Sequence, residues 1–161
     1  MSEALFDALG GGSTPAGLFG SPLPSESTDE ALSALVGLAR TARQRVRDTF
    51  GTDVSPDSEG ISKLDTVIDG IWRQEWPGNE SSAYPILVTD LGSLLAVALL
   101  ALPGTQPVFR SSSELLHFSA WVLSRHAEFF PFHKIAKSLS FRFGEKATQL
   151  YAEAQRACAV A

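Results

Sequence analysis

The sequence predicts an α+β fold that is mostly helical, with a small antiparallel β-hairpin or sheet between the third helix and two C-terminal helices. Apolar residues recur at three- and four-residue spacing over most of the chain, as expected of helices that each bury one face. Only between residues 107 and 123 does the pattern favour extended strands. A bundle made only of helices is the alternative, because residues 113–130 also fit one long helix.

The composition is that of one globular domain with an acidic balance. Of the 161 residues, 44% are apolar, which is enough to fill a single core. The 18 acidic and 13 basic side chains give a net charge of −5, which argues against non-specific binding of nucleic acid. The single cysteine, Cys158, can form neither an internal disulfide nor a thiolate zinc cluster. No signal peptide opens the sequence, so we expect a cytoplasmic protein.

The first 27 residues are rich in Gly, Ser and Pro and predict a flexible N-terminal arm ahead of a single globular domain, residues 28–161. Two apolar pairs interrupt this composition. They are Leu5 with Phe6, and Leu18 with Phe19. Each pair is either an incidental part of a disordered tail or an anchor that docks on a partner protein or on the chain's own domain.

Three helices are expected in the first two thirds of the chain. A capping box at residues 27–30 begins the first helix, and Gly51 ends it. The second helix is expected over residues 62–75, after a polar loop. The third, residues 86–102, is apolar on nearly all sides. Its uninterrupted apolar run is too short for the roughly 20 residues of a membrane span, so it predicts a buried central helix and no membrane partner.

The last third of the chain predicts the strands and two further helices. Residues 107–111 and 115–123 are expected to pair as an antiparallel hairpin. Pro131 is suited to the first turn of a helix that ends near Leu139. The final helix is expected over residues 145–157.

The candidate site residues fall into two groups, and we expect neither a catalytic residue nor a cofactor or bound metal. Aromatic and apolar anchors are candidates for partner binding. Four basic residues near the C-terminus form a candidate anion-binding patch, with its lysines facing outward. The partner-binding candidates are Leu5, Phe6, Leu18, Phe19, Trp72 and Trp76, and the anion-binding candidates are Lys134, Lys137, Arg142 and Lys146.

Three segments occur in a recognisable order in the second half of the chain. Leu91 and Gly92 open an apolar helix, the sequence PFHKIAKSL covers residues 131–139, and GEKATQLY covers residues 144–151. This order resembles a family of small uncharacterised bacterial proteins that have a Leu-Gly helix, a hairpin with a tryptophan (Trp121 in this chain) and a Pro-Phe-x-Lys-Val-x-Lys corner. The resemblance implies an α+β fold and no particular reaction.

The sequence therefore favours a non-enzymatic protein-interaction module, such as an immunity-like or adaptor protein, that uses its surface and its Leu-Phe arm. One alternative is a structural component of a homo-oligomer or larger assembly, anchored by the arm. Another is a small metal-dependent hydrolase that uses Asp65 and Asp69, which lie one helical turn apart, together with histidines. The histidines available are His117, His126 and His133. We do not expect a nucleic-acid partner, because the net charge is negative.

Overall fold

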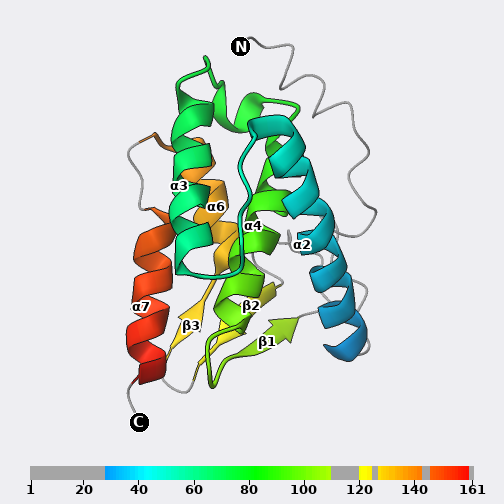
Figure 1. Cartoon of the computed structure of the whole chain (residues 1–161), viewed down its shortest axis with the longest axis vertical. Helices are drawn as coiled ribbons and strands as arrows, with labels where there is room; N and C mark the ends of the chain where they lie inside the picture. Colours follow the sequence, from blue (N-terminus) through cyan, green and yellow to red (C-terminus); the bar gives the residue numbers. More distant parts are fainter. Residues whose placement is uncertain (1–27, 110–119, 125–126, 143–145, 160–161) are drawn as a thin grey trace.

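The computed structural model describes residues 28–109, 120–124, 127–142 and 146–159 (Figure 1). The predicted N-terminal arm, His117 and His126 lie outside these residues. The elements in chain order are α2 (Thr28–Phe50), α3 (Ser58–Trp72), the short 3₁₀ helix η1 (Gly78–Glu80), α4 (Tyr84–Leu100), β1 (Gln106–Phe109), β2 (Ala120–Leu123), β3 (Glu128–Phe129), α6 (Pro131–Ser140) and α7 (Ala147–Ala159). The predicted class, α+β and mostly helical, is confirmed.

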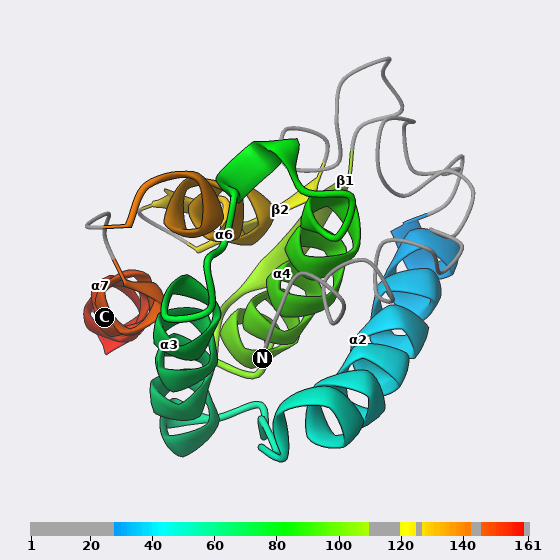
Figure 2. The same ribbon diagram turned by 90° about the horizontal axis from the view of Figure 1, so that it is seen from above.

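Helix α4 is the centre of the fold. Seen from above, it lies among the other helices, with α2 on one side and α6 on another (Figure 2). Nearly every side chain from Ile86 to Leu99 is buried. This agrees with a sequence that is apolar around the whole helix, because such a helix has no polar face to turn toward water. None of the described helices is both long enough and apolar enough to cross a membrane.

Helix α6 packs closely on α4 because Gly92 has no side chain. The ring of Phe132, which is fully buried, lies against the backbone of Gly92. The same ring also contacts the apolar cluster formed with Leu35 of α2 and Ala96 of α4. One aromatic side chain thus joins three helices at a point where only glycine leaves enough room.

Helix α3 begins earlier than the sequence predicted. The expected start was residue 62, because Pro56 and Gly60 suggested a loop. Instead, Asp57 caps the helix, and its Oδ1 accepts a hydrogen bond of 2.9 Å from the amide of Gly60. The helix ends at Trp72, not at residue 75, and Glu75 adopts a left-handed backbone with φ of 52°.

Among the described residues, the sheet has three antiparallel strands in the order β1-β2-β3, so the fold is not a bundle made only of helices. Val108 is opposite Trp121, and Val122 is opposite Phe129. The predicted pairing of the first two strands is confirmed over these residues, whereas residues 110–119 lie outside the described part. The sequence did not predict β3, because two residues are too few to show an alternating pattern.

The last two helices agree with the sequence. Helix α6 begins at Pro131, as predicted, and buries Phe132, Ile135 and Leu139 in the core. Helix α7 begins at Ala147, two residues later than expected, and packs on α3.

Candidate interaction groove

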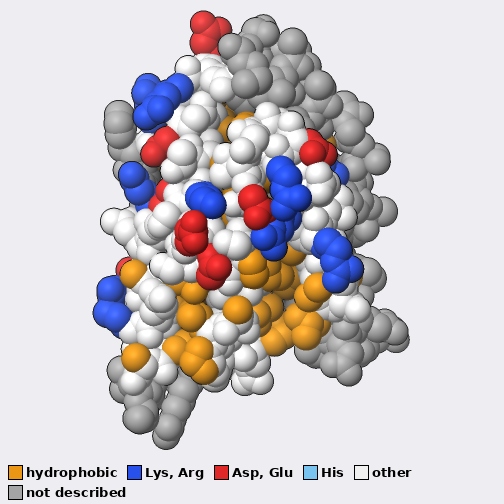
Figure 3. Space-filling model, in the orientation of Figure 1, with side chains coloured by type: hydrophobic (Ala, Val, Ile, Leu, Met, Phe, Trp, Pro, Cys, Tyr) orange, Lys and Arg blue, Asp and Glu red, His pale blue; other side chains and the backbone are white. Residues whose placement is uncertain are grey.

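An apolar groove of about 490 Å³ lies between α2, α4 and the segment that joins α2 to α3. Figure 1 shows α2 slanting away from α4 toward the N-terminal end of α2, and the groove opens between these diverging parts. Figure 3 shows apolar side chains gathered on this face, below a group of charged ones. We call this feature the α2–α4 groove.

The walls of the α2–α4 groove come from three segments. Helix α2 supplies Leu32, Val36 and Ala39, which recur at helical spacing on one edge. The C-terminal half of α4 supplies the opposite wall, and the segment before α3 closes one end. The residues of the opposite wall are Leu94, Val97, Leu100 and Ala101, and those of the closing segment are Val54 and Pro56.

Val36 is the most informative residue of the groove. Its side chain is 41% exposed, and among the described residues only Val36 and Phe141 are large apolar side chains with such exposure. Leu32, Val97 and Leu100 beside it are half-buried. Apolar surface gathered in one hollow is typical of a binding site, whereas isolated apolar residues on a surface are ordinary.

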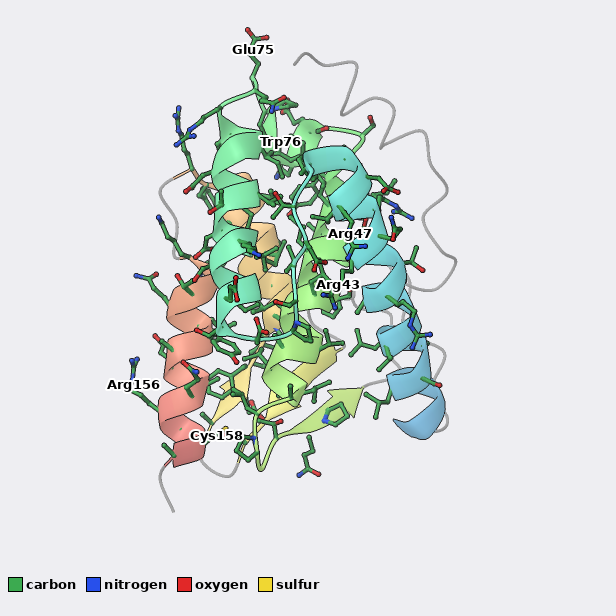
Figure 4. The ribbon with its side chains drawn as sticks, viewed as in Figure 1. Arg43, Arg47, Glu75, Trp76, Arg156 and Cys158 are labelled. Carbon is green, nitrogen blue, oxygen red and sulfur yellow. The ribbon has the colours of Figure 1, made fainter. Side chains whose placement is uncertain are left out.

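Arginines of α2 form the polar edge of the groove. The guanidinium of Arg43 donates two hydrogen bonds to Asp53, of 2.6 and 2.8 Å, and Arg47 donates a third, also of 2.8 Å. These bonds hold the pKa of Asp53 well below its usual range. Figure 4 shows Arg43 and Arg47 near one another on α2, facing the segment that carries Asp53. The side chain of Arg43 is thereby fixed as a wall of the groove.

Arg40 differs from these two arginines. It lines the groove and is exposed, and it makes no hydrogen bond or ion pair with the described residues. The carboxylate of Asp53 is already shared by Arg43 and Arg47. The groove therefore combines an apolar floor with one available cation at its edge.

The two predicted tryptophan anchors are used inside the fold. The indole nitrogen of Trp72 donates a 2.9 Å hydrogen bond to the carbonyl of Ser138, and that of Trp76 donates a 2.7 Å bond to the carbonyl of Leu139. Both acceptors are among the last carbonyls of α6, which lack partners within the helix. Trp76 is only 6% exposed, so its ring is a core anchor that ties the segment after α3 to the end of α6.

The predicted anion-binding patch is not one outward-facing cluster. Lys134 is 8% exposed, so the expectation that it faces solvent is wrong; Lys137 is exposed. The pKa of His133 is lowered mainly by burial, and the charges of Lys137 and Lys134 lower it further. Arg142 and Lys146 do lie together, around a hollow of about 30 Å³. Carboxylates share that hollow, and the Nζ of Lys146 is 3.9 Å from Asp69, so its charge is partly balanced.

Asp65 has a structural partner that the sequence did not reveal. Its carboxylate accepts hydrogen bonds from the amides of Ala147 (2.8 Å) and Thr148 (3.1 Å) and from the Thr148 hydroxyl (2.6 Å). Asp65 thus caps the N-terminus of α7 from another helix, where a negative charge is favourable. In the described part of the chain, no group of three or more His, Cys, Asp or Glu side chains could hold a metal ion.

Sequence reasoning did not identify the α2–α4 groove. A signal was available, because Leu32, Leu35 and Val36 make the apolar arc of α2 wider than a single buried stripe needs.

Comparison of the chain with protein-family models, curated proteins and solved structures finds no match.

Proposed function

We propose that the chain is a non-enzymatic protein-interaction module, of the immunity-like or adaptor kind, whose α2–α4 groove receives an apolar segment of a partner protein. The observation that carries this proposal is the position of the exposed Val36 in an apolar hollow of about 490 Å³ with Arg40 at its edge. Burial of apolar area provides the driving force for such binding, at about 25 cal/mol per Å² removed from water.

The positive charge of Arg40 at the edge of the groove indicates that the partner segment carries an acidic residue. Arg40 can donate charge-assisted hydrogen bonds to a carboxylate, and such bonds are about twice as strong as neutral ones. The guanidinium of Arg43 is held by Asp53, so its charge is already paired. The preferred ligand is therefore a short segment with two or three large apolar side chains and an acidic residue beside them.

The alternative of a hydrolase based on Asp65 and Asp69 receives less support. Both oxygens of Asp65 accept hydrogen bonds from α7, so this carboxylate already has a role in the fold. Asp69 is exposed and faces Lys146. The contacts of Asp65 favour a role in stability over one in catalysis.

Selection of peptides on the full chain tests the proposal. A random library of 12-residue peptides is selected on the immobilised protein, and each enriched peptide is titrated against three proteins: the wild type, Val36→Glu and Arg40→Glu. We expect enriched peptides to contain apolar residues next to Asp or Glu. Val36→Glu should weaken binding at least tenfold, because it places a charge on the apolar floor. Arg40→Glu should weaken it about three- to tenfold and reduce its dependence on salt.

Matched controls come from the same protein. Phe141→Glu changes the other exposed large apolar residue, which is 65% exposed and lies outside the groove. Lys63→Glu reverses a charge on α3, away from the groove. Neither control should alter the affinity by more than twofold. Equal losses in Val36→Glu and Phe141→Glu, or enriched peptides that Val36→Glu binds as well as the wild type, would contradict the proposal.

A further inference from the structure

The chain carries a segment that matches the ligand preferred by the α2–α4 groove. Residues 1–27 contain three acidic side chains and no Lys or Arg. Two of the acids, Glu3 and Asp7, flank the apolar pair Leu5 and Phe6. The second pair, Leu18 with Phe19, has only Gly, Ala, Ser and Pro within three residues on either side. Of the two pairs, only the first combines apolar anchors with acidic neighbours.

The point of attachment brings this segment near the groove. The arm joins the N-terminal end of α2, and the same helix supplies Leu32, Val36 and Arg40 to the groove. From Thr28 to Arg40 the distance along the helix axis is about 18 Å, at 1.5 Å per residue.

The tether has a length that suits this distance. Eighteen residues, 10–27, separate Leu9 from the start of α2. A flexible Gly-rich chain of this length has a root-mean-square end-to-end distance of about 24 Å. Because the effective concentration of a tethered segment is greatest when these two lengths agree, the arm is suited to fold back onto its own α2.

We infer that residues 3–9 of the arm occupy the α2–α4 groove of the same molecule. Leu5 and Phe6 bury their side chains against Val36 and the wall from α4, and Glu3 or Asp7 pairs with Arg40. On the proposed function, on which this consequence rests, the arm is an internal competitor. A partner segment must displace it, so the arm sets the affinity of the module.

A spin label near the start of the arm tests this inference in the full chain. The label is attached at Ser2→Cys in a Cys158→Ser background, and signals of the Val36, Val97 and Leu100 methyl groups are recorded by NMR. We expect the label to broaden these signals. The broadening should not depend on protein concentration between 10 and 200 µM, because the contact is intramolecular.

Arm variants provide the matched comparison. Leu5→Ser with Phe6→Ser should abolish the broadening, and Arg40→Glu should reduce it, whereas Leu18→Ser with Phe19→Ser should leave it unchanged. Absence of broadening in the parent protein would overturn the inference. Broadening that grows with concentration, or that depends on Leu18 and Phe19 instead of Leu5 and Phe6, would also overturn it.

The consequence for partner binding has a separate readout. If the arm occupies the groove nine tenths of the time, the apparent affinity for a library-selected peptide falls about tenfold, and Leu5→Ser with Phe6→Ser should recover that factor. The losses expected for Val36→Glu and Arg40→Glu apply in full to this arm variant, because in the wild-type chain each substitution also weakens the competing arm. Label-dependent broadening without any groove-binding peptide would sustain the docking of the arm and refute the proposed function. If groove-binding peptides bind the wild type and the arm variant equally well and no broadening is seen, the proposed function stands and the docking of the arm is refuted.

Discussion

Substitution of Gly92 by Ala tests the packing on which the whole arrangement depends. In an ordinary helix this change is favourable, by about 1 kcal/mol, because alanine has the higher helix propensity. At Gly92, however, the new Cβ would lie 2.9 Å from Cε1 and 3.0 Å from Cγ of the Phe132 ring, and closer still to Cδ1. The ring is fully buried and packs against Leu35 of α2 and Ala96 of α4, so a shift of the ring must displace these neighbours.

The expected net effect follows from these two opposing contributions. An overpacked core costs about 1–3 kcal/mol, and a contact this short with a rigid ring belongs at the upper end of that range. After the gain in helix propensity, Gly92→Ala should lower the free energy of unfolding by about 2 kcal/mol. Gly70→Ala in α3 is the matched control. Its Cβ meets no atom within 4 Å, so it should raise stability by about 0.5–1 kcal/mol.

Urea unfolding followed by tryptophan fluorescence measures both changes. A double-mutant cycle with Phe132→Leu then isolates the contact between the two positions. The smaller side chain gives the new methyl group room, so the double variant should be at least 1 kcal/mol more stable than the sum of the single changes predicts. A Gly92→Ala protein as stable as the wild type, or strict additivity in the cycle, would show that the Phe132 ring does not oppose a side chain at position 92.

Three further predictions concern groups within the fold. Asp65→Ala should cost about 2 kcal/mol and speed hydrogen exchange selectively in α7, because it removes three hydrogen bonds to the start of that helix. Burial raises the pKa of Asp90 to about 6, an effect that the Arg45 guanidinium 3.1 Å away opposes. Since the folded protein binds this proton more tightly than the unfolded chain, the stabilisation is present below a pH of about 4 and is lost as the pH rises through 6. Urea titrations measure the free energy of unfolding at pH 5 and at pH 7. The gain in stability from pH 7 to pH 5 should be about 1 kcal/mol larger in the wild type than in Asp90→Asn. Gly60→Ala should destabilise the protein by about 2 kcal/mol or more, as measured by urea unfolding, because its Cβ would overlap the backbone of Ser55.

The sequence predicted the features that depend on local pattern. Helix α4 is apolar on all sides, and it is the buried centre of the fold. Pro131 begins α6 because proline suits the first turn of a helix. The pairing of the first two strands followed from short β-prone segments separated by a turn.

The features that the sequence did not predict depend on contacts between distant parts of the chain. Asp65 caps a helix that starts 82 residues later, and nothing in the spacing of Asp65 and Asp69 distinguishes a cap from a catalytic pair. The tryptophans form a helical stripe in the sequence, yet their hydrogen bonds go to the end of α6. Lys134 is buried because α6 lies deep in the molecule, which its own amphipathic pattern does not reveal.

The α2–α4 groove also depends on contacts between distant parts of the chain, so the sequence did not predict it. Its existence depends on how far α2 diverges from α4, and that angle is set by packing, including the contact of Phe132 with Leu35. The exposed position of Val36 follows from the same angle, because a closer approach of the two helices would bury it.

A methyl NMR titration of the full chain with a library-selected peptide tests whether the α2–α4 groove is the binding surface. The largest shifts should occur at Val36, Val97 and Leu100; Val36→Glu should abolish those of Val97 and Leu100, whereas Phe141→Glu should preserve all three. Shifts concentrated instead on Leu139 and Leu150, near Phe141 and α7, with the groove methyl groups unchanged, would contradict binding in the groove.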